Sequence, residues 1–409
     1  MGTYAEKPSF RWLVAAFIPV LAACAGSTGN IEDSLSRAAD GKRPGRDWRV
    51  APLTSLTIPA GARSIADNAY PYNRIRAIVL PDSIVSIGKN AFSYNALESI
   101  RFSQNLESIG NEAFTVNKLS GAVFPPTLTS IGDKAFAANS LTQVRFEGAP
   151  THIGDFAFAF NKIEALNLPE GTTETGNWTF ASNRIQSLIL PGTLSSIGTG
   201  AFASNELRRI DLPEGLVSIG HRAFAKNRLT SVVIPARLRV LGREAFFSNE
   251  LESITLPAGL TAIPDRAFAE NRLNTLTLNQ RVRRIGMGAF AGNRLTSLTL
   301  GENITALGQG AFERNEIAEL RFVRSSLYVL PARAFADNKL TRLALPYSLT
   351  RLGGSVFAGN EITEIRLGRD LRFGVDDFGV YGAAFHAFYA AKKKTGGTYT
   401  FADGEWKRN

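Results

Sequence analysis

One sequence pattern recurs from about Leu53 and limits what this chain can fold into. Each copy reads L-x-x-I-x-L-P-x-x-L-x-x-I-G-x-x-A-F-x-x-N-x. One copy is too short to bury its apolar residues, but stacked copies can bury them against each other, so the pattern predicts a solenoid. The aromatic position is filled by Tyr70, Phe92, Phe114, Phe136, Phe158, Phe180, Phe202, Phe224, Phe246, Phe268, Phe290, Phe312, Phe335 and Phe357. These positions are equally spaced except for the step to Phe335, which is longer by one and indicates an inserted residue near residues 323–329.

An asparagine stands three residues after the aromatic position in all fourteen copies. The series is Asn73, Asn95, Asn117, Asn139, Asn161, Asn183, Asn205, Asn227, Asn249, Asn271, Asn293, Asn315, Asn338 and Asn360. An amide held once per coil can bond its own chain and the backbone of the next coil at a tight turn. Each buried polar group left without a partner would cost about 1–3 kcal/mol. We therefore predict a structural role for these asparagines rather than a row of ligand-binding amides.

The L-x-x-I-x-L segment alternates apolar and polar residues at its end, as in Leu207, Ile210 and Leu212. Such alternation is typical of a short strand with one buried face. Stacking would place these strands in a parallel sheet about 4.8 Å apart, so fourteen coils would extend roughly 65 Å. A glycine stands directly after the second Ile position of the motif in eleven of the fourteen copies, for example Gly88 and Gly110. That column predicts a turn or a close approach of two backbones.

The first residues of the chain have the pattern of an export signal. Lys7 and Arg11 precede an apolar run, residues 12–23. This run is too short for a membrane-spanning helix of about 20 residues but is typical of a signal-peptide core. It ends in Leu21-Ala22-Ala23-Cys24, which resembles the lipobox of bacterial lipoproteins. The resemblance implies cleavage before Cys24 and lipid attachment at its thiol; the alternative is an ordinary secretory signal with an incidental cysteine. We expect residues 1–23 to be a signal peptide and the polar residues 24–50 to be a flexible tether.

The repeat resembles the BspA-like, treponemal-type leucine-rich repeats of bacterial surface proteins over residues 51–368. The L-x-x-I-x-L-P segment, the I-G pair and the A-F-x-x-N segment carry this resemblance. It implies a β-rich leucine-rich-repeat solenoid of about fourteen 22-residue coils with a parallel sheet. The pattern departs from the common consensus L-x-x-L-x-L-x-x-N-x-L, because its Asn stands two residues before the first Leu of the next coil. This departure leaves open which segment forms the inner sheet.

The repeat motif fails after Leu367, and we expect residues 369–409 to cover the last open coil. The aromatic residues Phe385, Phe388, Tyr389 and Trp406 suit a cap. This region also resembles the C-terminal tail of the treponemal-type members. The alternative is a basic binding tail, because residues 392–394 are all lysine.

Neither composition nor motifs indicate catalysis. The chain has three histidines, His152, His221 and His386, and one cysteine, so a cysteine-rich metal site is impossible. A Gly-rich phosphate loop, H-E-x-x-H and G-x-S-x-G are all absent from the sequence. We expect a protein that is not an enzyme and has neither a metal site nor a cofactor.

The net charge of +10 is spread along the chain, which favours simple solubility over an acidic partner. The position after each Asn is basic in eight copies, but glutamates interrupt it in four, as at Glu206 and Glu250. A groove that follows phosphates would not place acids there, so nucleic acid is not the expected partner. Anionic lipid and acidic glycan stay open on charge alone.

Partners would bind side chains that the repeat does not need. On the expected strands these flank the central Ile or Leu, and the variable candidates are Arg101, Arg145, Asn167, Arg209 and Asp211. A second candidate is aromatic. Phe156 and Trp178 occupy the usually polar position two residues before the aromatic slot, in neighbouring copies, where Thr175 replaces the usual Ile. Either Trp178 folds inward to fill the space that Thr175 leaves, or both rings form an exposed platform for an apolar knob or a sugar ring.

These features together predict a lipid-anchored binding protein of the cell envelope. Resemblance to the BspA-like family implies a surface adhesin that recognises host matrix proteins or other bacteria. The membrane would be reached through the N-terminal lipid, and the outer membrane or cell surface is favoured over the inner membrane. Two alternatives stay open: a periplasm-facing scaffolding lipoprotein and a glycan-binding module.

Overall fold

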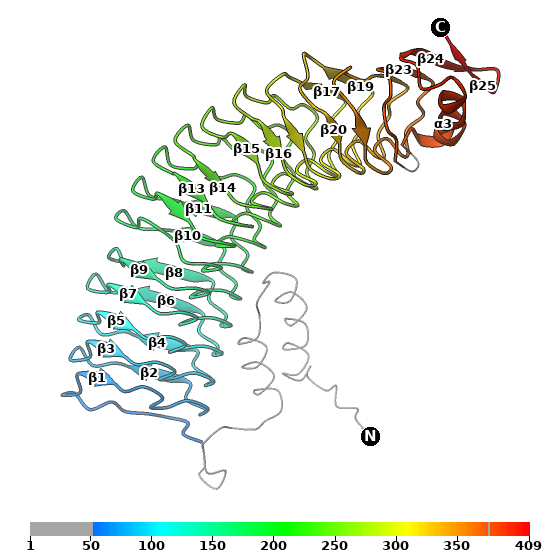
Figure 1. Ribbon diagram of the computed structural model, residues 1–409. Coiled ribbons are helices and arrows are strands. Elements are labelled where there is room, and N and C mark those ends of the chain that lie inside the picture. Colours follow the sequence, from blue (N-terminus) through cyan, green and yellow to red (C-terminus); the bar gives the residue numbers. More distant parts are fainter. Residues whose placement is uncertain (1–51, 375–376) are drawn as a thin grey trace, which may run out of the picture.

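The computed structural model describes residues 52–374 and 377–409. The chain winds into a curved solenoid of about 14 turns of about 22 residues, which confirms the fold predicted from the repeat (Figure 1). The expected signal peptide, Cys24 and the tether lie outside the described residues.

The coils form strands on two faces rather than on one, and on each face the parallel pairing is divided into several short sheets. The L-x-x-I-x-L segment forms strands of three or four residues on what we call the long-strand face. These strands are β2 (Ala77–Val79), β4 (Ser99–Arg101), β6 (Gly121–Phe124), β8 (Gln143–Phe146), β10 (Ala165–Asn167), β11 (Ser187–Ile189), β17 (Ser297–Leu300), β19 (Glu319–Phe322), β21 (Arg342–Ala344) and β23 (Glu364–Leu367). The sequence predicted this sheet.

The sequence did not predict the second sheet, which the two residues before the Gly column form on the short-strand face. Its strands are β1 (Ser64–Ile65), β3 (Ser86–Ile87), β5 (Ser108–Ile109), β7 (Ser130–Ile131), β9 (His152–Ile153), β12 (Ser196–Ile197), β13 (Ser218–Ile219), β14 (Val240–Leu241), β15 (Ala262–Ile263), β16 (Arg284–Ile285), β18 (Ala306–Leu307), β20 (Val329–Leu330) and β22 (Arg351–Leu352). Two residues are too few to show alternation, so this strand has no periodic signal of its own. Partners in both sheets lie one full coil apart in the chain, as in Ser64↔Ser86 and Ala77↔Ser99.

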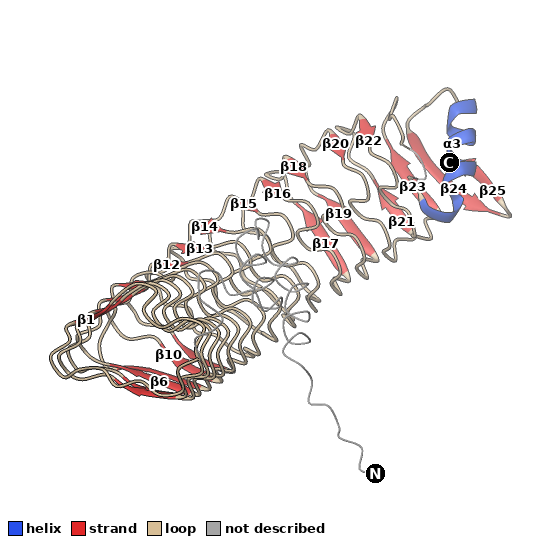
Figure 2. Ribbon diagram, turned by 90° about the horizontal axis from the view of Figure 1, so that it is seen from below, coloured by secondary structure: helices blue, strands red, loops and turns tan. Residues whose placement is uncertain are grey.

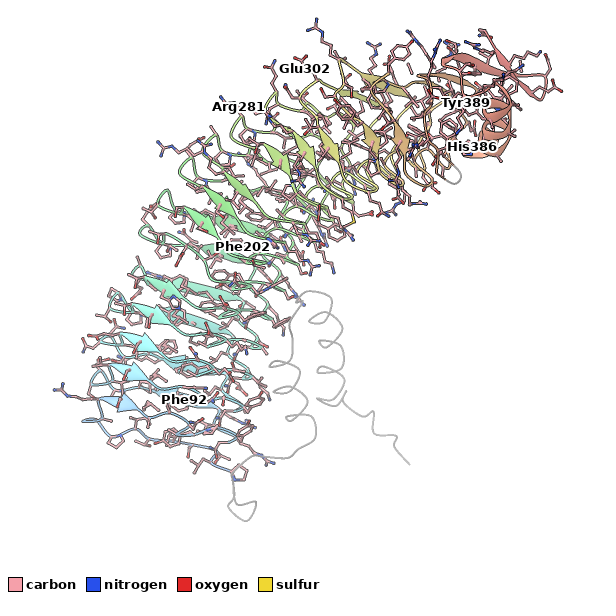
Figure 3. The ribbon with its side chains drawn as sticks, viewed as in Figure 1. Phe92, Phe202, Arg281, Glu302, His386 and Tyr389 are labelled. Carbon is pink, nitrogen blue, oxygen red and sulfur yellow. The ribbon has the colours of Figure 1, made fainter. Side chains whose placement is uncertain are left out.

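The two sheets are the flat sides of the solenoid. Viewed from below, β1 lies on one side of the first coils and β6 and β10 lie on the opposite side (Figure 2). Arg281 and Glu302 belong to loops that run from the long-strand face to the short-strand face, and both lie on the convex edge (Figure 3). The A-F-x-x-N segment makes the other connection and therefore follows the concave edge. Neither sheet forms the concave side, which resolves the question that the sequence left open.

A continuous stack of aromatic rings fills the centre of the solenoid. All thirteen phenylalanines of the repeat are fully buried, and Tyr70 packs against the first of them. Consecutive ring centroids lie 5.1–5.7 Å apart from Tyr70 to Phe357. Each such pair adds about 0.5–1.5 kcal/mol beyond the area it buries. The stack therefore stabilises every junction between coils by the same interaction.

The repeated asparagine closes each coil and joins it to its neighbour. Asn117 accepts a hydrogen bond at Oδ1 from the N–H of Leu97, 20 residues earlier in the same copy, at 3.0 Å. Its Nδ2 donates to the carbonyl of Phe114 at 3.1 Å and to that of Phe92, in the preceding coil, at 2.9 Å. The predicted structural role is confirmed with one correction, because the bonded neighbour is the preceding coil rather than the next.

The Gly column marks a close approach of backbones, as predicted. A Cβ added at Gly110 would lie 2.6 Å from the backbone nitrogen of Lys89 in the preceding coil. Real Cβ contacts are never this short, so a larger residue would push the coils apart.

The stack continues for one irregular coil beyond the motif. The ring of Phe378 lies 6.1 Å from Phe357, and Arg351 pairs with Arg372 in parallel. Beyond it, a short 3-10 helix, η1 (Gly379–Tyr381), leads into α3 (Gly382–Ala391). Strand β24 (Gly397–Ala402) then pairs antiparallel with β23, and β25 (Glu405–Arg408) pairs with β24. Four rings of this cap are buried: Phe385, Tyr389, Tyr399 and Trp406.

The asparagine network gives a direct test in the middle of the array. Asn227 is 7% exposed and bonds the N–H of Leu207 and the carbonyl of Phe202. Asn227→Ala should lower the free energy of unfolding by roughly 1–3 kcal/mol, because both backbone groups lose a buried partner. Arg228→Ala, at the exposed next residue, should cost under about 0.5 kcal/mol. Equal losses in chemical denaturation would contradict the network.

Candidate partner-binding surfaces

The predicted polar candidates form an exposed row on the long-strand face. Arg101, Arg145 and Asn167 are exposed on β4, β8 and β10. Asp211 continues the row and lies 3.3 Å from the guanidinium of Arg209, which is also exposed. The carboxylate of Glu147 lies 3.7 Å from Arg145. The fold thus brings these five candidates to one face, where solvent weakens both ion pairs.

Aliphatic residues interrupt this row, and sequence reasoning did not select them as candidates. Val79, Val123, Ile189 and Val233 are 61%, 52%, 58% and 81% exposed. Strand pairing places Val79 beside Arg101 and Val123 beside Arg145. A partner on this face would therefore meet branched aliphatic and charged side chains in alternation. The signal that could have found them is a β-branched apolar residue at an outward strand position.

The concave edge carries a second set of side chains, in a backbone conformation that the sequence did not reveal. We define the inner rows as the residues two before and two after the aromatic position of each coil. All twenty-eight of these residues have positive φ, and only five are glycine: Gly200, Gly288, Gly292, Gly310 and Gly359. A residue with a Cβ is uncommon in this region and bulky ones are outliers, yet Val116 and Trp178 both adopt it.

The left-handed residues arise from the hydrogen bonding of the edge. In one coil the N–H groups of Asn90, Phe92 and Tyr94 donate to carbonyls of the following coil at 2.9, 2.8 and 2.8 Å. The outer two members of this set have φ near +55°. Residues with positive φ alternate with residues of the opposite hand along this segment, so every second N–H points in the same direction. Three hydrogen bonds per coil therefore run along the solenoid axis. These backbone hydrogen bonds therefore impose positive φ on the inner rows, and they do so with any side chain at those positions.

Phe156 and Trp178 lie on this concave edge, away from the polar row. Their rings are nearly parallel, with centroids 6.1 Å apart and an interplanar angle of 12°. Trp178 is only 8% exposed and packs with Ala181, Ala203 and the partly buried Phe156 in a cluster separate from the main core. Neither sequence interpretation describes this arrangement. Trp178 is not an exposed platform, and its cluster is distinct from the core beside Thr175.

Trp178 is buried because the next coil has a glycine in the same row. A Cβ at Gly200 would lie 2.3 Å from a ring carbon of Trp178, so the indole covers the position that a side chain would occupy. Phe156 therefore lies on one side of the indole in the stack, and Gly200 lies on the other. The signal for this burial was an aromatic residue followed by glycine at the same position of the next copy.

Two tyrosines stack at the N-terminal end of the concave edge. The rings of Tyr72 and Tyr94 lie 4.8 Å apart at 11°. Burial raises the pKa of Tyr94 above its ordinary value, and the neighbouring Tyr72 and Glu112 raise it further. The phenol therefore stays neutral at physiological pH and can act as a hydrogen-bond donor there.

The described residues offer no arrangement typical of catalysis. Residues 52–374 and 377–409 hold no group of three or more His, Cys, Asp or Glu that could bind a metal ion. His152 and His221 are exposed, and His386 stacks on Phe373 in the cap at 4.8 Å. Within the same residues, no helix has both the length and the apolar character needed to cross a membrane.

The packing of Trp178 predicts unequal effects of two identical substitutions. Gly200→Ala should displace the indole, lower the melting temperature and shift Trp fluorescence to the red. Gly288→Ala, in the same row, imposes a similar positive φ, but its nearest side-chain atom is 3.3 Å away on flexible Arg266. We expect the loss at Gly200 to exceed that at Gly288 by about 1–3 kcal/mol, the usual cost of overpacking. Matching losses and unchanged fluorescence would refute the packing of Trp178 on Gly200.

The chain matches one protein family and is similar to several solved structures. The BspA type leucine-rich repeat region family matches residues 49–162, 129–251 and 239–364. A leucine-rich repeat protein from Bacteroides ovatus is 22% identical, with 78% of this chain and 73% of that chain covered and a TM-score of 0.44. A leucine-rich cell surface protein from Faecalibacterium prausnitzii is 18% identical, with 79% and 82% covered and a TM-score of 0.39. YopM, a leucine-rich effector from Yersinia pestis, is 21% identical, with 91% and 94% covered and a TM-score of 0.44.

Comparison with curated protein sequences found no match. The family match nevertheless spans most of the chain, and it agrees with the repeat, the parallel sheets and the coil length. Leucine-rich repeats generally mediate protein–protein interactions, and no enzymatic family is indicated. The chain belongs to the BspA type leucine-rich repeat family of bacterial surface proteins.

Proposed function

We propose that the chain is a lipid-anchored adhesin of the cell envelope, which binds host matrix proteins or proteins of other bacteria through its repeats. The observation that carries this proposal is that each coil has one set of residues that stabilises the fold and another set that is exposed. Buried Phe, Asn and Gly columns hold the scaffold, while the exposed rows on the long-strand face carry side chains of different charge and polarity. A rigid scaffold with variable outward rows is the arrangement by which repeat proteins bind extended partners.

We infer that the polar row of the long-strand face contributes contacts. Arg101, Arg145, Asn167, Arg209 and Asp211 are its candidate residues, together with the aliphatic residues between them. Exposed arginines and aliphatics combine hydrogen-bonding capacity with apolar area, and arginine is enriched at interface hot spots. Arg145→Ala should weaken binding to immobilised partner by roughly tenfold, which is the loss expected for an interface hot spot. Arg184→Ala, a cation outside this row, serves as the matched control.

The anchor rests on the sequence Leu21-Ala22-Ala23-Cys24. Three acyl chains on a processed cysteine hold a protein stably in a membrane, whereas one chain is marginal. Cys24→Ser should yield an unprocessed or soluble product that takes up no labelled palmitate. Persistent acyl label in this variant would disprove lipidation at Cys24. A wild-type protein that carries no acyl label and is processed in the same way as the variant would instead support an ordinary secretory signal.

Exposure on the cell surface separates an adhesin from a periplasm-facing scaffold. Both would carry the same anchor, so the anchor cannot decide between them. We expect protease added to intact cells to remove the protein, while a periplasmic marker stays intact. Protection of the chain until the outer membrane is opened would exclude the adhesin and favour the scaffold. Adhesion of cells to matrix-coated surfaces should fall in parallel with removal of the protein.

A further inference from the structure

A pocket of about 210 Å³ lies on the concave edge beside Trp178. Its lining comes from five successive coils, from the coil of Trp178 to that of Arg266. Ala203 and Ala225 are buried and make its apolar floor. Trp178 lines one end and Phe247 lies towards the other. The pocket is built from inner-row residues and the residues that follow the aromatic position, so it lies on a different surface from the polar row.

Phe247 is an exception to the repeat, and it positions a cation. The residue after the aromatic position is alanine in most coils, and Phe247 is its only aromatic member. The guanidinium of Arg266, one coil further on, lies over the Phe247 ring at 4.5 Å from the centroid. A cation held over an aromatic face keeps its charge while its position is restricted. Arg266 thus stands at one end of the pocket without needing a carboxylate to fix it.

The charges around the pocket do not cancel. The inner rows hold five cations from residue 222 onward: Arg222, Lys226, Arg266, Arg314 and Arg333. Three are in ion pairs, Arg222 with Glu244 at 2.8 Å, Arg314 with Glu270, and Arg333 with Glu313 at 2.8 Å. Within the described parts of the chain, Lys226 and Arg266 have no carboxylate within salt-bridge distance, and both line this pocket. The pocket therefore favours an anionic occupant.

The spacing and surroundings of the two cations select among anions. They belong to coils two steps apart, or roughly 10 Å along the stack, which exceeds the reach of a single carboxylate. Acidic side chains two residues apart in an extended segment lie about 7 Å apart and adjust by rotamer, so they could engage both. A long polyanionic glycan would gain little beyond the pocket, because the next cations along the inner rows, Arg314 and Arg333, are already paired with Glu270 and Glu313.

We propose that this pocket receives a short acidic segment of a protein partner. One carboxylate binds Lys226, a second binds Arg266, and the methylene groups of these side chains lie on Ala203 and Ala225. This proposal rests on the proposed function and adds the chemistry of the partner. It also assigns recognition to the concave edge as well as to the long-strand face.

The test uses the full chain and a fluorescein-labelled peptide of six glutamates, with binding followed by anisotropy. We expect the double variant Lys226→Ala/Arg266→Ala to bind at least about 10-fold more weakly than wild type, as is typical for loss of paired charges at an interface. The control Arg184→Ala/Arg228→Ala removes the same charge from two exposed positions outside the pocket and should change affinity less than about twofold. Unchanged melting temperatures of both variants would confirm intact folds.

Three outcomes would overturn the proposal: no binding of hexaglutamate, equal weakening in both double variants, or tighter variant-sensitive binding of a heparin hexasaccharide. The last outcome would assign the pocket to an acidic glycan. Adhesion assays with the same variants separate this proposal from the proposed function. If the wild type adheres and the pocket variant adheres equally well, the pocket proposal is overturned and the proposed function is not. If the wild type does not adhere, the proposed function is overturned.

Discussion

The side-chain amide of one asparagine per coil is the interaction on which the regular solenoid depends. It joins the beginning and the end of each coil, and it also donates a hydrogen bond to the carbonyl of the aromatic residue in the preceding coil. The copy with an inserted residue shows how strictly this closure is kept. Asn338 still accepts the N–H of Ile317 at 3.0 Å, now across 21 residues, and still donates to Phe312. The extra residue is absorbed before β20, where Arg324 has a φ of 47°, so the aromatic stack continues undisturbed.

The backbone hydrogen bonds of the concave edge determine where side chains can vary. The concave ladder requires positive φ at both inner rows, but its hydrogen bonds use only backbone groups. Glu112 and Phe156 therefore occupy equivalent positions in one inner row, and Lys226 and Gly292 occupy equivalent positions in the other. A non-glycine residue there has a conformational cost of about 1–2 kcal/mol, which regular hydrogen bonding between coils must offset. Side chains kept at such positions are good candidates for a role outside the fold.

Much of the fold could be predicted because its determinants are periodic in the sequence. The Phe stack, the Asn closure and the long-strand face each correspond to one column of the repeat. The short-strand face was missed because strands such as Ser86–Ile87 are stabilised by the register of the stack and not by a local pattern. The burial of Trp178 was missed because it depends on Gly200 in the following copy. The ion pairs of the concave edge could not be predicted from the sequence either, because Arg314 contacts Glu270 two coils away.

Residues that hold the fold and residues that can vary occupy different columns of the repeat, and this explains how a uniform scaffold can recognise a particular partner. A charge in an inner row has neighbours about 5 Å away in the coils on either side, so those neighbours decide whether it is neutralised. Glu244 neutralises Arg222, and Gly292 allows Glu270 to extend past it to Arg314. Phe247 instead holds Arg266 without neutralising it. Because carboxylates flank this stretch, the uncompensated charge is confined to about three coils. A partner would therefore need a short acidic segment of matching length, and a uniformly charged polymer would gain little from the rest of the edge.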